Sequence, residues 1–285
     1  MRRLVERHLA GKTITRQVLT LEKLLRDSPV PSLDPIVGQK VMAGRRRAKI
    51  LMIDLTAGIS LMLHFKLAGQ LAIFVPGGER AVAGHPVPRP DGEYPHKATH
   101  WTLWFDDGTI AYYSDIRQFG WIRLLPTDDV AAALLKFSFG PEAVGTNGIT
   151  IDDLATKLQR RSIPIKQALL DQGVLAGLGN IYVDEALHSA KIHPLRPAKG
   201  LTSSEIARLH PAIAWSLEQG ITQGGAKIIH SRAYPIDGFP AVHAREGEPC
   251  GTCGTKIVKT RVGGRGTYFC PVCQPVSITA APTQT

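Results

Sequence analysis

The sequence predicts an α+β protein, with an N-terminal β-sandwich or barrel and a flanking helix, then a helical region and a small cysteine-bearing hairpin. From residue 13 to about 125, short apolar runs alternate with turn residues, as in all-β domains. From about 150 to 230, the apolar residues recur with the helical period instead. All four cysteines lie within 250–273, which sets a third module apart.

The flanking helix is predicted over residues 1–10, where apolar positions 1, 4, 5 and 9 form one stripe and Gly11 suits a C-terminal cap. No Ser, Thr, Asp or Asn precedes it as an N-cap, and Arg2 and Arg3 oppose the helix dipole in its first turn. This abrupt beginning leads us to expect that a preceding segment is missing.

Two hairpins are predicted among the strands. Residues 49–55 and 59–65 are joined by Thr-Ala-Gly, and residues 101–105 and 109–113 flank Asp-Asp-Gly. Residues 76–99 are rich in Pro and Gly and are expected to form a surface loop.

In the helical region, Thr150 is expected to cap one helix, and Thr202 with Glu205 has the spacing of a capping box ahead of another. Residues 226–245 show no clear period and are expected to form a long loop. The predicted organisation is a sandwich domain over 1–130, a helical domain over 131–245, a ribbon over 246–274 and a disordered tail over 275–285.

The cysteines form two C-x₂-C pairs, Cys250 with Cys253 and Cys270 with Cys273, separated by sixteen residues. Four thiolates at this spacing can close a tetrahedral zinc site, whereas free thiols are the alternative. Because four cysteines leave no open position on the metal, we expect one structural zinc and no catalytic metal.

The chain is basic, with 34 Lys and Arg against 24 Asp and Glu and a pI near 9.6. The ribbon concentrates this charge, because Lys256, Lys259, Arg261 and Arg265 lie between the cysteine pairs without an acidic neighbour. Such charge favours a nucleic-acid partner, although a solvated hairpin face would have the same composition. The apolar runs fall short of the roughly 18 residues that cross a membrane, and no secretory leader is seen, so a cytoplasmic protein is expected.

Several motifs, in order, resemble the formamidopyrimidine-DNA glycosylase/endonuclease VIII family, and the formamidopyrimidine-DNA glycosylases most closely. They are Arg46-Arg-Ala-Lys49, Asp115-Ile-Arg-Gln-Phe-Gly, Gly177-Leu-Gly-Asn-Ile-Tyr with Glu185 and Ile192-His-Pro, Gln223-Gly-Gly, and Gly247-Glu-Pro-Cys-Gly-Thr-Cys-Gly. The resemblance implies a β-sandwich followed by a helix–two-turn–helix domain and a zinc ribbon.

The resemblance also implies the activity: a bacterial base-excision-repair enzyme that flips an oxidised base, such as 8-oxoguanine or a formamidopyrimidine, out of duplex DNA and cleaves its glycosidic bond. AP-lyase activity then nicks the abasic strand by β,δ-elimination through a Schiff base. The partner is double-stranded DNA with damaged bases or abasic sites. The expected protein is a cytoplasmic monomer, associated with the nucleoid when it is bound to DNA.

By motif, Lys49 matches a lysine that assists elimination, with a plain phosphate contact as the alternative. Arg265 matches a ribbon arginine linked to phosphate binding and δ-elimination, and Asn180 matches a phosphate-binding asparagine. Arg117 and Phe119 match a wedge that fills the gap left by the flipped base, although Phe119 could instead belong to the core.

Four further residues are assigned by the same motifs. Leu67 stands where the family has a void-filling methionine. Arg161, Lys166 and His100 align with phosphate contacts, and His100 could instead be a histidine packed within a strand.

One departure bears on catalysis. The family's nucleophile is an N-terminal proline amine, with a glutamate beside it, and neither is found ahead of the first helix. We therefore expect residues 1–285 alone to be impaired in cleavage. The alternatives are a non-catalytic damaged-DNA-binding paralogue and, more remotely, an unrelated zinc-ribbon protein of RNA metabolism. The loop after Gly225 aligns poorly, which leaves the preferred lesion open.

Overall fold

The computed structural model describes residues 1–276 except 147, 226–227, 230–231 and 234–237. The predicted tail lies outside the described residues from position 277 onward. Two compact units divide the chain, Met1–Ser138 and Phe139–Thr285. No described helix has both the length and the apolar character that a membrane crossing needs.

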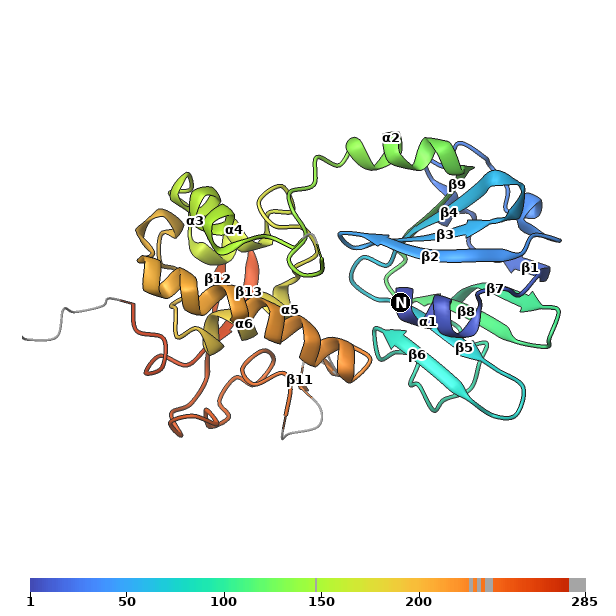
Figure 1. Cartoon of the computed structure of the whole chain (residues 1–285). Coiled ribbons are helices and arrows are strands. Elements are labelled where there is room, and N and C mark those ends of the chain that lie inside the picture. Colours follow the sequence, from blue (N-terminus) through green and yellow to red (C-terminus); the bar gives the residue numbers. More distant parts are fainter. Residues whose placement is uncertain (147, 226–227, 230–231, 234–237, 277–285) are drawn as a thin grey trace, which may run out of the picture. The chain divides into compact units, whose positions relative to one another are not determined.

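Two antiparallel sheets form the first unit, so the predicted β-sandwich is confirmed (Figure 1). The five-stranded sheet has the order β1 (Ile14–Leu19), β7 (Thr99–Phe105), β8 (Ile110–Asp115), β5 (Gly69–Phe74) and β6 (Arg80–Gly84). The four-stranded sheet has the order β2 (Val41–Arg47), β3 (Ile50–Leu55), β4 (Ile59–His64) and β9 (Trp121–Pro126). Both predicted hairpins, β3–β4 and β7–β8, are present.

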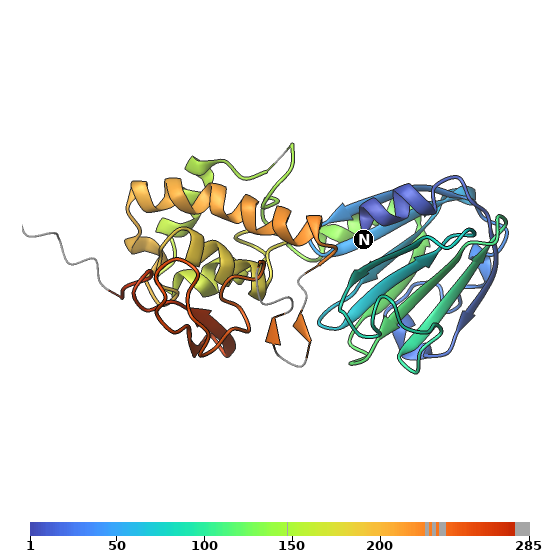
Figure 2. The same cartoon turned by 90° about the horizontal axis from the view of Figure 1, so that it is seen from below.

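The core of this unit lies between the sheets and includes buried residues such as Leu63 and Ile73. The predicted first helix, α1 (Arg2–His8), contacts β2, β3 and β6 along one edge of the sandwich (Figures 1 and 2). Val5 is its most deeply buried side chain and closes the core at that edge. The expected absence of a side-chain N-cap is confirmed.

The prediction of a surface loop over 76–99 was partly wrong, because β6 lies within it and pairs with β5. The remaining elements of the unit are short helical turns. They are η1 (Glu22–Leu25), η2 (Asp34–Ile36), η3 (Thr56–Gly58), η4 (Thr127–Asp129) and α2 (Val130–Leu135). The unit ends at Ser138, and Phe137 near that end stacks on Trp121 of β9 with ring centroids 6.0 Å apart.

The second unit begins with helices that pack around a core of their own. They are α3 (Ile151–Gln159), α4 (Ile165–Leu170), α5 (Asn180–Ser189), η5 (Ala198–Gly200) and α6 (Ser203–Thr222). Both predicted caps are confirmed: Thr150 accepts a hydrogen bond from the amide of Asp153, and Thr202 forms a full capping box with Glu205.

The second unit ends with the ribbon, in which β12 (Val258–Val262) pairs with β13 (Arg265–Phe269) as predicted. The expectation of an unstructured loop over 226–245 was incomplete, because β10 (Ile228–Ile229) and β11 (Arg232–Ala233) pair within it. Such short strands carry too few residues to show an alternating pattern.

Candidate nucleic-acid interface and zinc centre

The four cysteine sulfurs converge at the base of the ribbon, where they all lie within 4.8 Å of one another. Sγ of Cys250 lies 3.9 Å from that of Cys273, and Sγ of Cys253 lies 3.4 Å from that of Cys270. Zinc–sulfur bonds of about 2.3 Å in a tetrahedron require sulfurs roughly 3.8 Å apart, so the donor set fits one structural zinc. The cofactor prediction is therefore confirmed.

The thiols of this site differ in acidity before metal binds. Hydrogen bonds from Thr255 lower the pKa of the exposed Cys253 to about 6. Burial raises the pKa of Cys273 to about 12. Zinc must therefore displace protons from its ligands as it binds, which makes its affinity depend on pH.

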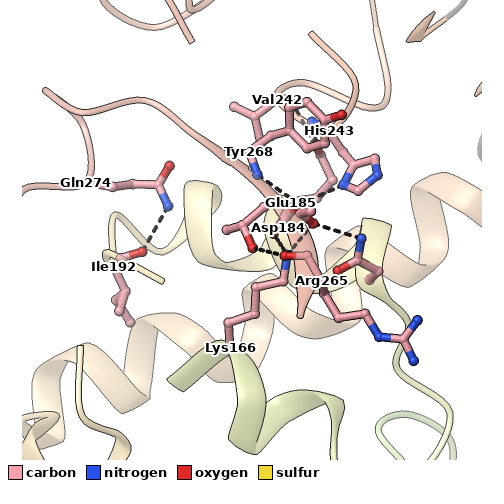
Figure 3. Close-up of polar contacts among 12 residues, drawn as sticks. Lys166, Asp184, Glu185, Ile192, Val242, His243, Arg265, Tyr268 and Gln274 are labelled. Atoms are coloured by element: carbon pink, nitrogen blue, oxygen red, sulfur yellow. Dashed lines mark hydrogen bonds and ion pairs between the residues drawn. The ribbon is translucent and has the colours of Figure 1, made fainter. Parts of the chain in front are cut away.

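A buried polar cluster joins the ribbon to the helices (Figure 3). Nζ of Lys166, on α4, donates to Oδ1 of Asp184 on α5 at 2.6 Å and to the carbonyl oxygen of Gly266 on β13 at 2.9 Å. The other oxygen of Asp184 accepts the amide of Tyr268 at 3.2 Å and lies 2.6 Å from Nδ1 of His243. The cluster fixes the ribbon against the beginning of α5.

This geometry corrects the assignment of Lys166 as a phosphate contact. Its side chain is 0% exposed, and its ammonium group is already used on Asp184 and Gly266. Burial lowers the pKa of Lys166, and the Asp184 carboxylate opposes that shift. Lys166 is thus a positioning residue for the ribbon, because it cannot reach a ligand outside the protein.

Asn180 and Arg265 meet the ribbon at the same point. Nδ2 of Asn180, the first residue of α5, donates to the carbonyl oxygen of Gly266 at 3.0 Å. The preceding turn contains Gly177, whose φ of +96° favours glycine. Arg265 is exposed, and its guanidinium points away from the buried cluster (Figure 3). The two residues predicted to bind phosphate are thus linked, because Asn180 donates to the residue that follows Arg265.

Glu185 is a buried residue for which the motif gave no role. It is 0% exposed and accepts the amides of Ala241, Val242 and His243 at 2.6, 3.0 and 2.8 Å. Burial raises its pKa, and these three donors oppose the rise. The carboxylate holds the segment that leads into the ribbon, and an acid on the apolar face of a predicted helix was the signal available in the sequence.

The first unit presents the predicted wedge on the loop between β8 and β9. Asp115 is fully buried, and its carboxylate accepts the amide of Arg117 at 3.1 Å and that of Gly120 at 2.7 Å. Phe119 is 48% exposed, and the guanidinium of Arg117 lies 5.0 Å from its ring centroid. The alternative that Phe119 belongs to the core is wrong, because the loop holds its ring at the surface.

Lys49 and Leu67 are also at the surface of the first unit, Lys49 in the β2–β3 turn and Leu67, 55% exposed, between β4 and β5. Ile50, which follows Lys49, pairs with His64 across the sheet. Nδ1 of His64 accepts the amide of Lys66 at 2.9 Å. Lys49 therefore lies at the end of the sheet where an imidazole is held in place.

The surroundings of His100 favour the second of its two assignments. It is 9% exposed, and its Nε2 lies 3.1 Å from the carbonyl oxygen of Asp115, to which it donates. Its alternative assignment as a histidine packed within a strand is the one that the structure supports. The imidazole connects β7 to the beginning of the wedge loop.

Arg161 is exposed after α3 and lines a hollow of about 260 Å³ together with Lys157, Arg160, Gly173 and Val174. The carboxylate of Asp171 partly offsets the positive charge of Arg161, because it lies 3.5 Å from the guanidinium. Three cations around one hollow suit an anion such as a phosphate.

Comparisons with known proteins assign three segments of the chain to known domains. Residues 1–122 match the formamidopyrimidine-DNA glycosylase N-terminal domain, and residues 139–231 match the H2TH domain of the same enzymes. Residues 247–276 match a zinc finger found in FPG and IleRS.

Curated relatives match over most of their length. The formamidopyrimidine-DNA glycosylase of Roseiflexus is 40% identical over 252 residues, which cover 87% of this chain and 86% of the relative. That of Pelotomaculum thermopropionicum is 36% identical, with 97% and 96% covered.

Solved structures are similar as well. The Lactococcus lactis formamidopyrimidine-DNA glycosylase, non-covalently bound to DNA with an AP site, has a TM-score of 0.79 and 32% identity, with 96% of each chain covered. The same enzyme in complex with Fapy-dG-containing DNA has a TM-score of 0.80. The resemblance inferred from the sequence motifs is thus confirmed, and the chain belongs to the formamidopyrimidine-DNA glycosylase family.

Proposed function

We propose that this protein is a base-excision-repair DNA glycosylase with AP-lyase activity, acting on duplex DNA that contains an oxidised base or an abasic site. The exposed pair of Phe119 and Arg117, held by the buried carboxylate of Asp115, is the observation that carries the proposal. A base taken out of the stack leaves a gap, and an aromatic ring with a cation over it can fill that gap.

The other residues of the candidate interface, of which Asn180 is only partly exposed, are proposed to bind the DNA. Asn180 and Arg265 would bind phosphate beside the ribbon, and Arg161 would bind a further phosphate at the basic hollow. Leu67, exposed between β4 and β5, would fill space beside the wedge. Direct side-chain contacts of this kind fix the register of a protein on DNA more than they read its sequence.

For the chemistry, we propose that Lys49 assists elimination and that Arg265 stabilises the phosphate that leaves during δ-elimination. Both side chains are exposed, so they are accessible to a bound strand. The zinc supplies only the fold of the ribbon, because its four thiolates leave no position for a substrate. The enzyme is proposed to act as a cytoplasmic monomer.

Borohydride trapping tests the proposal, because it converts a Schiff base between protein and abasic DNA into a stable covalent adduct. The family's nucleophile is an N-terminal proline amine with a glutamate beside it, so the assay compares residues 1–285 alone with a version that carries Pro-Glu-Leu-Pro-Glu-Val-Glu-Thr before Met1. We expect an adduct from the extended version on abasic and 8-oxoguanine duplexes, and little from residues 1–285 alone.

Phe119→Ala in the extended version is the matched control for recognition. It should reduce the preference for damaged over intact duplex while leaving zinc content unchanged. Tight binding of lesion DNA by both versions, with no adduct from either, would instead favour the non-catalytic damaged-DNA-binding paralogue.

A further inference from the structure

One contact of the zinc centre reaches outside the ribbon. Nε2 of His188, in the last turn of α5, lies 3.5 Å from Sγ of Cys250. Cys250 is 2% exposed and His188 is half-buried, so solvent has little access to either atom. The pair joins residues 62 positions apart, and chain connectivity alone does not bring them together.

The direction of this hydrogen bond follows from the metal. A zinc-bound cysteine is a thiolate, which accepts hydrogen bonds and cannot donate one. Nε2 of His188 must therefore carry the hydrogen. A neutral imidazole carries a single N–H, and in this contact that hydrogen lies on Nε2.

Two of the other sulfurs obtain donors from the ribbon itself. Sγ of Cys270 accepts the amide of Cys273 at 3.4 Å, and Cys253 accepts hydrogen bonds from Thr255. Within the described part of the chain, the donor that reaches Cys250 comes from α5. Four thiolates and one Zn²⁺ carry a net charge of about −2, which a partly buried site must offset with hydrogen bonds.

We propose that His188 is a positioning residue of the zinc centre, whose Nε2–H donates to the Cys250 thiolate, slows the loss of zinc and ties the first cysteine pair to α5. The second cysteine pair is tied to the same region by Gln274. Its Oε1 accepts the amide of Cys270 at 3.0 Å, and its Nε2 donates to the carbonyl oxygen of Ile192 at 2.9 Å (Figure 3). Both halves of the metal site are thus attached near the end of one helix.

Transfer of zinc from the loaded protein to an excess of a chromogenic chelator tests this role. His188→Phe keeps a ring of similar shape without a donor, and His188→Gln keeps an N–H. We expect the Phe variant to release zinc about tenfold faster than the natural chain, and the Gln variant to stay within about threefold of it. Ser189→Ala, on the exposed side of the same helical turn, controls for a general loosening of α5.

Cobalt substitution gives a second readout that does not depend on DNA. The absorption bands of four-thiolate tetrahedral Co²⁺ should appear in the natural chain and in both His188 variants, because the histidine donates to a ligand and is not one itself. Equal release rates for the natural chain and His188→Phe, or equally fast release from the Phe and Gln variants, would overturn the proposal. A weaker or shifted cobalt spectrum in His188→Phe would also overturn it, since His188 would then bind the metal directly.

Discussion

At the scale of single residues, burial and two neighbouring lysines keep the His64 imidazole neutral at the end of the sheet that carries Lys49. Its pKa is lowered to about 4, first by burial and then by the charges of Lys66 and Lys49. The hydrogen bond from the amide of Lys66 to Nδ1 also requires that nitrogen to be unprotonated. The ring is therefore neutral wherever Lys49 would act.

A pH dependence follows from this depressed pKa. Because the unfolded histidine titrates near 6.5, the stabilisation by neutral His64 is complete above that pH and is lost as the pH falls through about 4. The free energy of unfolding should decline between pH 6.5 and 4, and the decline should be shallower in His64→Gln. An NMR titration that places the His64 pKa above 6 would contradict this account.

The sequence identified the candidate DNA-binding residues better than it predicted whether each side chain faces solvent or the interior. Lys49, Arg117, Phe119 and Arg265 are exposed as a DNA contact requires, whereas Lys166 is turned inward. A lysine in a basic protein is expected to be solvated, and only the position of Asp184, eighteen residues later, makes its burial favourable. The partner of a buried charge comes from tertiary structure, so local pattern cannot reveal it.

At the scale of elements, the wedge loop depends on a glycine beneath it. A Cβ built on Gly120 would lie 1.8 Å from Oη of Tyr113. Gly120→Ala should therefore shift the loop and lower the free energy of unfolding by about 1–3 kcal/mol, as overpacking typically does. Denaturant unfolding measures this effect.

The matched partner is Tyr113→Phe, which removes the obstructing oxygen. Among the described residues, that buried hydroxyl has no hydrogen-bond partner of ordinary geometry, and burial followed by the nearby Asp115 carboxylate raises its pKa, so the single change should cost little. Combined with Gly120→Ala, it should restore part of the lost stability. A double variant no more stable than Gly120→Ala alone would show that the obstruction lies elsewhere.

Lys166 joins α4 to the ribbon through its hydrogen bond to Gly266, whereas Arg265 is exposed on the ribbon. Substitutions of these two residues should therefore cause two different defects in DNA binding. Lys166→Met leaves Asp184 without its buried cation and should destabilise the second unit by about 3–5 kcal/mol. Arg265→Ala removes an exposed cation and should leave stability nearly unchanged. Because Lys166 does not contact phosphate, its loss should weaken binding without changing the salt slope, whereas loss of Arg265 should lower that slope by about one. Titrations across a salt series separate the two, and a lower slope for Lys166→Met would contradict its burial.

Elements held by local chemistry were predicted well, and those held by distant partners were not. The two hairpins and the Thr202 capping box depend on residues close in sequence. In contrast, β6 has one buried residue among its five and is an edge strand, so its alternation is weak. Its pairing with β5 defines it as a strand, and the Pro- and Gly-rich surroundings hide that pairing.

At the scale of the whole molecule, the two units should respond differently to loss of zinc. Cys250→Ser, or chelation, should disorder the ribbon and abolish DNA binding, because Arg265 and the Gly266 carbonyl lose their positions. The sandwich has its own core and should remain folded. Hydrogen exchange resolved along the chain measures both effects, and protection of the ribbon without metal would contradict them.

The contact between Lys166 and Gly266 also has a consequence for biosynthesis, since it joins residues 100 positions apart. The ribosome makes the chain from its N-terminus at about 5–20 residues per second, and domains generally fold as they emerge. The sandwich can fold early, but the proposed phosphate-binding surface is complete only when residues 250–273 and their metal have joined α4 and α5. A nascent chain should therefore be unable to hold DNA until its last module has emerged and taken up zinc, so unfinished copies would not occupy damaged sites.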